Sequence, residues 1–352
     1  MLKTRIYLLF ALLISSAFLL EAQIVPVTTM DYGLMGYPLT IRYQKYATDT
    51  NFAQKEQKQS FIDDYQMTFN ENRRLVQRQH FISGNKDRYT VFTYDEVTRD
   101  LLKEELFEAN AKIVSTINHK YGYLGRVEEV ITVEYPASLG GANKMVSKQT
   151  YKWNAKGQLS EYSVYGDYAS REKTIEYYYG PQDSLIYTLT TYGFNKNIEK
   201  TTYKRDFKHH LIEMTAFRND QQVRRETYDL NDLFLVVGKK VYNGKNKLTL
   251  SYTYTYDEHN YMLSEVAKDK NKKWAIEYYY KYEKDKFFNW TKKTTYDGWE
   301  PKYIETRAIT YSDKDHFYQD LKDADQKKVI LNYGKEPETL KFQEDTKGRL
   351  DD

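Results

Sequence analysis

The sequence contains no cysteine among its 352 residues. This absence excludes disulfide bonds, thiolate metal sites and cysteine nucleophiles. Proline is scarce, with six residues, and none lies between Pro181 and Pro301, so nothing there interrupts the pairing of β-strands. The net charge is only +3, from 53 basic and 50 acidic residues, which gives no electrostatic reason to expect a nucleic-acid partner.

Aromatic residues are abundant, since the chain holds 36 tyrosines, 16 phenylalanines and 4 tryptophans. The mean hydropathy is strongly negative, at −0.80, a value that disordered chains also show. Disordered chains are poor in aromatic and β-branched residues, however, and tyrosine and threonine are typical of pleated, half-buried strands. The composition therefore predicts a folded, soluble and β-rich protein.

The start of the chain, at positions 1–22, is typical of a secretory signal peptide. Lys3 and Arg5 supply the positive start. A mainly apolar run follows from Ile6 to Leu20, and Ala22 offers a small residue for cleavage. The run is short for a membrane span, and an uncleaved anchor is the alternative. We expect an exported protein, periplasmic or secreted, without a lipid anchor and without an integral membrane span after signal removal.

An aromatic residue recurs just before a turn signal at nine positions, and the spacing between them is nearly regular. We call these residues the anchors, and they are Phe69, Tyr94, Tyr121, Trp153, Tyr179, Tyr203, Tyr228, Tyr256 and Tyr282. A second turn signal falls about midway between anchors, as at Asn243-Gly244 and Asp297-Gly298, which are strong hairpin signals. Each unit of about 26 residues is therefore predicted to contain two strands and two turns.

Each anchor has an apolar partner at an even offset. Six partners lie six residues after their anchors, namely Leu75, Val127, Leu159, Leu185, Phe234 and Met262. Three lie eight residues after, namely Leu102, Leu211 and Trp290. In the six-residue units, the position four residues after the anchor is glycine, aspartate or asparagine in five of six cases. These residues tolerate the positive φ that a hairpin turn with a left-handed residue requires.

The strands alternate in character. Tyr252, Tyr254 and Tyr256 share one face of their strand, and hydroxyl residues share the other, because strand side chains point alternately to two faces. The sequence predicts an all-β fold, a long antiparallel β-hairpin repeat meander of about twenty strands. Because a sheet of this length does not stay flat, we expect a curled sheet or a layered β structure, with the anchors on the concave or inter-layer side.

Four regions follow from these patterns. They are a signal peptide at 1–22, an N-terminal strand and polar segment at 23–60, the repeat domain at 61–314 and a charged tail at 315–352. The N-terminal strand is expected from Tyr37 to Tyr46, and a short helix around Asp315 to Lys327. Nearly half of the tail's residues are charged, so we expect little packing from its end.

Several turns carry a related motif. Residues 153–159 read Trp-Asn-Ala-Lys-Gly-Gln-Leu, and residues 256–262 read Tyr-Asp-Glu-His-Asn-Tyr-Met. The pattern Tyr-Asp-x-x-Gly-x-Leu resembles the YD repeat of RHS-type exported bacterial proteins. The stretch from 282 to 311 is similar to the closing unit of their small, repeat-only kind, which lacks a toxin domain. This resemblance implies β-hairpin repeats and an exported scaffold that is not an enzyme.

No catalytic motif stands out. The metalloprotease pattern His-Glu-x-x-His, the Gly-x-Ser-x-Gly elbow and the phosphate-binding glycine loop are missing. We therefore expect no catalytic residue, no metal and no cofactor. Trp274, Trp290 and Trp299 lie close together along the chain. Trp290 is a repeat partner and is expected in the core, so Trp274 and Trp299 are the candidate ligand-binding residues, because flat aromatic rings can stack on sugars.

The function we expect is that of a non-catalytic structural or binding scaffold at the bacterial envelope or outside the cell. Its partner would be a protein or a glycan. One alternative is a glycan-binding module that uses exposed Trp and Tyr side chains. Another is a hydrolase acting on a glycan, with two carboxylates inside the curled sheet and a perturbed pKa for one of them.

Overall fold

The computed structural model describes residues 28–48, 61–122, 124–135, 144–166, 170–194, 197–271 and 273–312, without the side chains of residues 144–146, 274 and 275. In this part a 3-10 helix, η1 (Met30–Tyr32), precedes the strands. The strands are β1 (Pro38–Ala47), β2 (Phe61–Phe69), β3 (Leu75–Ile82), β4 (Asn85–Tyr94), β5 (Leu101–Glu108), β6 (Ile113–Tyr121), β7 (Val127–Glu134), β8 (Lys144–Trp153), β9 (Leu159–Tyr165), β10 (Arg171–Tyr179), β11 (Leu185–Tyr192), β12 (Ile198–Arg205), β13 (Leu211–Arg218), β14 (Gln221–Leu230), β15 (Val236–Asn243), β16 (Leu248–Tyr256), β17 (Met262–Asp269), β18 (Trp274–Lys284), β19 (Trp290–Asp297) and β20 (Glu300–Tyr311). The expected signal peptide at 1–22 and the charged tail at 315–352, with its helix, lie outside the described residues. None of the described residues form a helix with the length and apolar character of a membrane span.

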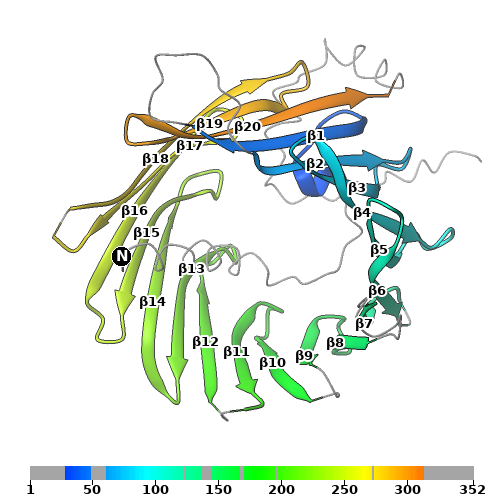
Figure 1. Cartoon of the computed structure of the whole chain (residues 1–352). Helices are drawn as coiled ribbons and strands as arrows, with labels where there is room; N and C mark the ends of the chain where they lie inside the picture. Colours follow the sequence, from blue (N-terminus) through cyan, green and yellow to red (C-terminus); the bar gives the residue numbers. More distant parts are fainter. Residues whose placement is uncertain are drawn as a thin grey trace, which may run out of the picture.

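These strands form one 20-stranded antiparallel sheet. Each strand pairs with the next along the chain, and β1, which lies within one residue of the strand expected from Tyr37 to Tyr46, pairs with both β2 and β20. Ile41 of β1 lies opposite Met67 on one side and Ile309 on the other. The sheet therefore closes into a barrel, as Figure 1 shows. The expected all-β meander of about twenty strands is confirmed, and closure leaves it without an open edge.

Strand alternation gives this wall an inner and an outer face. The helix η1 lies inside the ring in Figure 1, and Leu34, just after it, packs with Ile41, Met67 and Phe69. Side chains on the same face as these residues point inward. By register, all nine anchors lie on this inner face, which confirms their expected place on the concave side.

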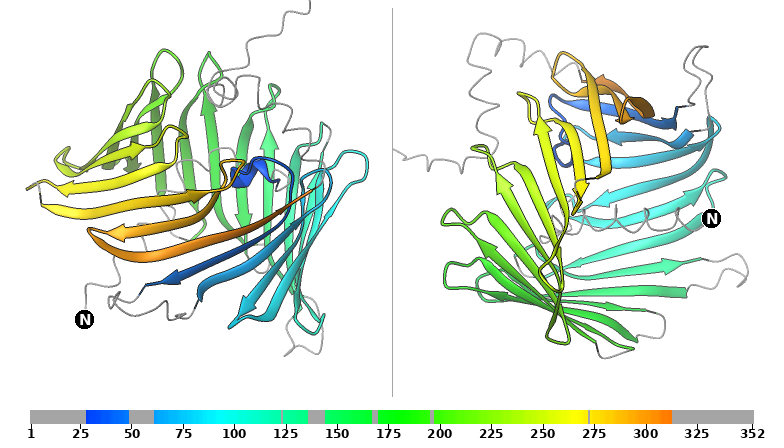
Figure 2. Two further views of the ribbon diagram at one scale, coloured as in Figure 1. Left: turned by 90° about the horizontal axis from the view of Figure 1, so that it is seen from above. Right: turned by 90° about the vertical axis from the view of Figure 1, so that its left-hand side faces the viewer.

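Buried side chains form three separate groups along the inner wall. The first comprises Leu34, Ile41, Met67, Phe69, Leu75, Phe92 and Leu101. The second comprises Val127, Val130, Tyr151 and Leu159, and the third Val241, Tyr252, Tyr254 and Ala267. Figure 2 shows that the strand direction turns around the barrel between these groups, as the twist of a long sheet requires. Stability therefore comes from neighbouring hairpins, as in other repeat proteins.

The turns after the even-numbered strands gather at one rim of the barrel, which we call the anchor rim. In the turn after β8, the Asn154 side-chain oxygen accepts hydrogen bonds from the N–H groups of Lys156 and Gln158, both at 3.0 Å. The same cap is supplied by Asn70, Asp206, Asn231, Asp257 and Asp285. The aspartate of the Tyr-Asp pair at 256–257 is thus a turn cap.

Left-handed residues complete these turns. Five of the six expected positions have positive φ, namely Arg73, Gly125, Gly157, Asp183 and Asn260. The expectation is wrong at Asp232, because β14 continues two residues beyond Tyr228 and displaces the turn. Phe234 is the left-handed residue there, with φ of 61°.

One left-handed position gives a test of the turn geometry. Ala111, exposed between β5 and β6, has φ of 65°, where a Cβ costs roughly 1–2 kcal/mol. We expect Ala111→Gly to raise the free energy of unfolding by about 0.5–1 kcal/mol, although glycine is more flexible in the unfolded chain. Urea denaturation measures the change. Ala267→Gly, at a fully buried strand position, should lower the stability, and a loss in both variants contradicts the strained-turn account.

Candidate functional site on the inner wall

Six of the nine anchors share one polar contact. The Tyr94 hydroxyl donates a hydrogen bond to the carbonyl of Leu75, the first residue of the preceding strand, at 2.8 Å. The equivalent bond, 2.8 to 3.0 Å long, recurs at Tyr121, Trp153, Tyr179, Tyr256 and Tyr282. Each of these rings lies along the inner wall and satisfies its polar atom on the backbone. The repeat therefore favours tyrosine over phenylalanine at these positions.

The apolar partners begin the strands that follow the anchors. Tyr121 lies opposite Val127, and Tyr256 lies opposite Met262. After each such pair, one residue of the odd-numbered strand is skipped in the register, which is a β-bulge. Bulges of this kind follow the first residue of all nine odd-numbered strands from β3 to β19, and they help a wide sheet to curve.

Two predicted partners are wrong. Leu101, at 1% exposure, lies opposite Tyr94, whereas the expected partner Leu102 is the bulged residue and is 38% exposed. Val236 begins β15 in place of Phe234, which belongs to the turn. Both errors arise because the length of the turn region after the anchor varies by one or two residues.

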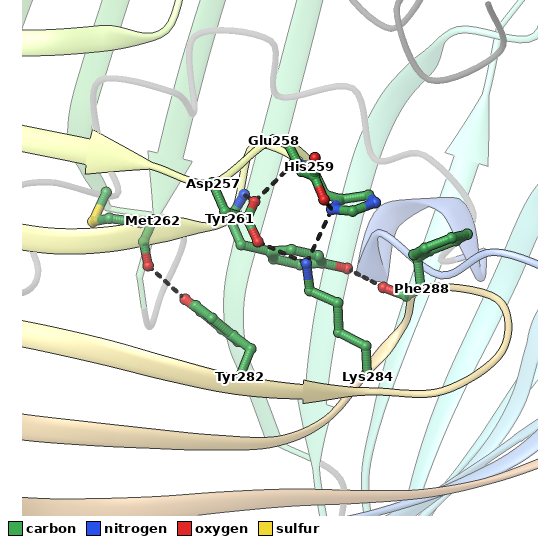
Figure 3. Close-up of polar contacts among 8 residues, drawn as sticks. All are labelled: Asp257, Glu258, His259, Tyr261, Met262, Tyr282, Lys284 and Phe288. Carbon is green, nitrogen blue, oxygen red and sulfur yellow. Dashed lines mark hydrogen bonds and ion pairs between the residues drawn. The ribbon is translucent and has the colours of Figure 1, made fainter. Parts of the chain in front are cut away.

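Side chains join neighbouring turns along the anchor rim (Figure 3). Lys284 Nζ lies 2.6 Å from Asp257 Oδ2 and 3.2 Å from His259 Nδ1. The His259 ring stacks on Phe288, with centroids 4.7 Å apart, and the Tyr261 hydroxyl donates to the Phe288 carbonyl at 2.8 Å. Burial would raise the pKa of Asp257, but hydrogen bonds from Lys284 and two backbone N–H groups outweigh it and lower this pKa. These contacts fasten one repeat unit to the next.

The predicted ligand-binding tryptophans lie at the opposite rim. Trp274 begins β18, and its side chain lies outside the described part. Trp299 follows Gly298 in the turn between β19 and β20 and is 91% exposed. Its ring lies nearly parallel to that of Tyr279, with centroids 6.3 Å apart. Trp290, expected in the core, lies on the inner wall, where it is half-buried and outside the three buried groups.

The inner wall of β14 to β17 carries buried charges that no sequence motif indicated. Glu226 is 6% exposed, with Arg224 at 2.5 Å and the Tyr228 hydroxyl at 2.8 Å. Lys239 is 7% exposed. Burial lowers the pKa of Lys239 and raises the pKa of Glu265, on β17. The wall thus holds Glu226 in an ion pair, and it holds Glu265, whose charged form is disfavoured by burial.

A second polar group lies on the inner wall where the barrel closes. The Glu305 carboxylate accepts a hydrogen bond from the Tyr43 hydroxyl at 3.2 Å. It also lies 3.4 Å from Lys293 Nζ and 3.9 Å from Lys45 Nζ. Tyr43 stacks on Tyr65, with ring centroids 4.8 Å apart. Across the described residues, no group of three or more His, Asp or Glu side chains is arranged to hold a metal ion.

Several inward-facing tyrosines have a raised phenol pKa, and burial is its largest cause. It raises the pKa of Tyr121 to about 12. The same cause raises the pKa of Tyr177, Tyr254 and Tyr280. These hydroxyl groups therefore remain neutral hydrogen-bond donors throughout the physiological range.

This shift predicts a loss of stability in alkali. The folded pKa of these acids lies above the ordinary value of 10.0, so the stability they contribute is present below pH 10 and is lost as the pH rises toward the folded value. We expect phenolate absorbance to appear together with loss of the β-sheet circular dichroism signal above about pH 10. Ionisation of most tyrosines near pH 10 with an intact sheet would contradict this.

The pairing and the inner wall define a class, that of closed antiparallel β-barrels built from hairpin repeats. No protein-family model matches the chain. No curated protein matches it. Among solved structures, it is similar to a porin-like protein from Bacteroides uniformis, with 10% identity, a TM-score of 0.33 and coverage of 78% of this chain and 98% of that chain.

Two further solved structures show a comparable likeness. A porin-like protein from Bacteroides vulgatus has 7% identity and a TM-score of 0.28, with coverage of 79% of this chain and 100% of that chain. The TcdB2-TccC3 structure has 9% identity and a TM-score of 0.28, with coverage of 75% of this chain and 18% of that chain. These scores are too low to transfer any property, so the function is argued from this chain's own residues.

Proposed function

We propose that this protein is an exported, non-catalytic scaffold at the bacterial envelope or outside the cell, and that the inner wall of the barrel is its ligand-binding surface. The observation that carries the proposal is the concentration of tyrosine hydroxyls and buried charges on the inner face. Barrels with this many strands enclose more space than side chains fill. Inner residues such as Thr190 retain partial exposure, which supports access to this wall.

The side chains of the outer face favour contact of the barrel with water over contact with lipid. Most strands from β5 onward place a charged side chain there, by register Lys103, Lys120, Glu129, Lys152, Glu161, Glu176, Lys200, Glu213, Lys240, Lys268, Lys281 and Lys292. A lysine or arginine facing lipid at the centre of a bilayer costs about 2–4 kcal/mol. A charged outer wall around an aromatic inner wall is the reverse of the pattern that a lipid-facing barrel needs.

The spacing of the two inward acids on β14 and β17 does not suit hydrolysis. Glu226 and Glu265, the inward carboxylates beside Lys239, lie on β14 and β17. Three strand spacings separate these strands, or about 14 Å along the wall. Glycosidase pairs lie within about 10 Å of each other, so these two acids do not suit a hydrolytic pair.

Capture by insoluble cell-wall polysaccharide tests the proposal. Because the chain lacks cysteine, Thr190→Cys and Thr191→Cys can each be labelled with a bulky maleimide; Thr190 faces inward and its neighbour Thr191 is exposed outside. We expect the label at position 190 to block capture and the label at 191 to leave it unchanged. No soluble sugar should be released. Equal capture of both labelled proteins would overturn the inner-wall assignment, and release of sugar would overturn the non-catalytic one.

A second candidate function is glycan binding at Trp299, because this ring is 91% exposed and lies flat beside Tyr279. In the same capture assay, loss of binding in Trp299→Ala would support it. Phe207→Ala is the matched control, since Phe207 is 88% exposed in a turn of the anchor rim. Unchanged capture of the Trp299 variant would exclude this site.

A further inference from the structure

An arginine on the inner wall has no carboxylate partner in the described part of the chain. Arg307 lies on β20, on the same face as Ile41 and Trp290. Its guanidinium carbon lies 3.7 Å from the centroid of the Trp290 ring. Among the described residues, no carboxylate oxygen lies within ion-pair distance of it and none accepts a hydrogen bond from it. A half-buried arginine without such a partner is uncommon, because burial of an unpaired charge is costly.

The stacking contact does not use the hydrogen-bonding capacity of the guanidinium. A guanidinium that stacks on an aromatic ring contacts it through its flat face, while its five N–H donors point outward in the plane. The donors of Arg307 are therefore oriented by Trp290 but are not engaged by it. This arrangement is suited to a planar oxyanion, which can accept two parallel hydrogen bonds.

The nearest inward acid on the same strand is already engaged. Glu305, two residues before Arg307, accepts from Tyr43 and lies between Lys293 and Lys45. Two cations therefore share this one carboxylate. With Arg307 included, the closing region of the inner wall has three cationic groups and two acids, Glu305 and Asp63, which lies opposite Lys45. The cations outnumber the acids, so the region is complementary to a negatively charged ligand.

Aromatic rings flank the same place. Tyr43 and Tyr65 stack on each other, and the Tyr43 ring lies edge-on to Trp290, with centroids 6.5 Å apart. Rings with polar tips can contact the apolar face of a sugar while their hydroxyls hydrogen-bond. Guanidinium donors beside such rings are complementary to a sugar ring that carries a carboxylate.

We infer that Arg307, with Trp290, Tyr43 and Tyr65, binds the carboxylate of an acidic sugar. This inference rests on the proposed function and specifies the chemistry of its ligand.

Calorimetric titration of the whole chain with trigalacturonic acid and with its methyl ester tests the inference. Wild type should bind the acid about tenfold or more tightly than the ester, because a charged hydrogen bond contributes about 1.5–3 kcal/mol. Arg307→Gln should lower the affinity for the acid to that for the ester, and Arg307→Lys should give an intermediate value. Arg225→Gln, at an arginine on the outer face of β14, is the matched control and should bind as wild type does.

Three results would overturn the inference. The first is equal affinity for the acid and the ester. The second is unchanged affinity for the acid in Arg307→Gln, with folding confirmed by circular dichroism. The third is tighter binding of inorganic phosphate than of the acid, which would assign the Arg307 donors to a phosphate. None of these results affects the comparison of labels at positions 190 and 191, so failure of this inference and failure of the proposed function can be told apart.

Discussion

Replacing Asn289 with leucine is expected to lower the free energy of unfolding by about 3–5 kcal/mol. Asn289 is 1% exposed. Its side-chain oxygen accepts from the Met35 N–H at 2.7 Å, and its side-chain nitrogen donates to the Met35 carbonyl at 2.9 Å and to the Tyr311 hydroxyl at 2.8 Å. One side chain thus joins the segment before β1, the turn after β18 and the end of β20. Leucine would leave buried polar groups without partners.

Denaturation in urea measures this change, and Asn243→Ala provides the control. The Asn243 side chain caps an exposed turn, accepting from the N–H groups of Lys245 and Lys247, so its loss should cost no more than about 1 kcal/mol. If the two variants lose similar free energy of unfolding, Asn289 contributes no more than an ordinary turn cap. Its contacts with Met35 and Tyr311 would then add nothing to the stability.

Tyr254→Asp is expected to cost at least about 3 kcal/mol. The Tyr254 side chain is 9% exposed on the inner wall and lies opposite Glu265 in the register. The substitution removes a buried ring and introduces a second buried carboxylate beside Glu265. Burial already disfavours the charged form of Glu265. Thr253→Asp, one residue earlier on the exposed outer face, should change stability by less than about 1 kcal/mol. Melting temperatures compare the two, and the opposite order would mean that the faces are reversed.

The sequence predicts the local parts of this fold well. The anchors occur at a regular interval. Five of the six expected left-handed positions have positive φ, and four of these five are glycine, aspartate or asparagine, because hairpin turns impose strict demands on φ. The even offset between Tyr256 and Met262 similarly reflects a pair that faces across one hairpin. Such features depend on residues a few positions apart, and short spacing is visible in a single sequence.

Features that depend on distant residues could not be predicted. The pairing of β1 with β20 decides between a closed barrel and a curled sheet, and no local pattern encodes it. Arg307 is one of many basic residues in the sequence. Its importance arises only when the register places it over Trp290 and assigns Glu305 to Lys293 and Lys45. The prediction of Leu102 and Phe234 as apolar partners is wrong because a difference of one or two residues decides where each strand begins.

The pairing of β1 with β20 also has a consequence for how the chain folds. The other pairings join consecutive strands, so hairpins can form soon after their residues become available. Closure joins residues as far apart as Thr40 and Thr310, which are 270 positions apart. Until that contact forms, the growing sheet has two open edges that can pair with other chains. We therefore expect closure to be the slow step of folding and the step that protects the chain against aggregation.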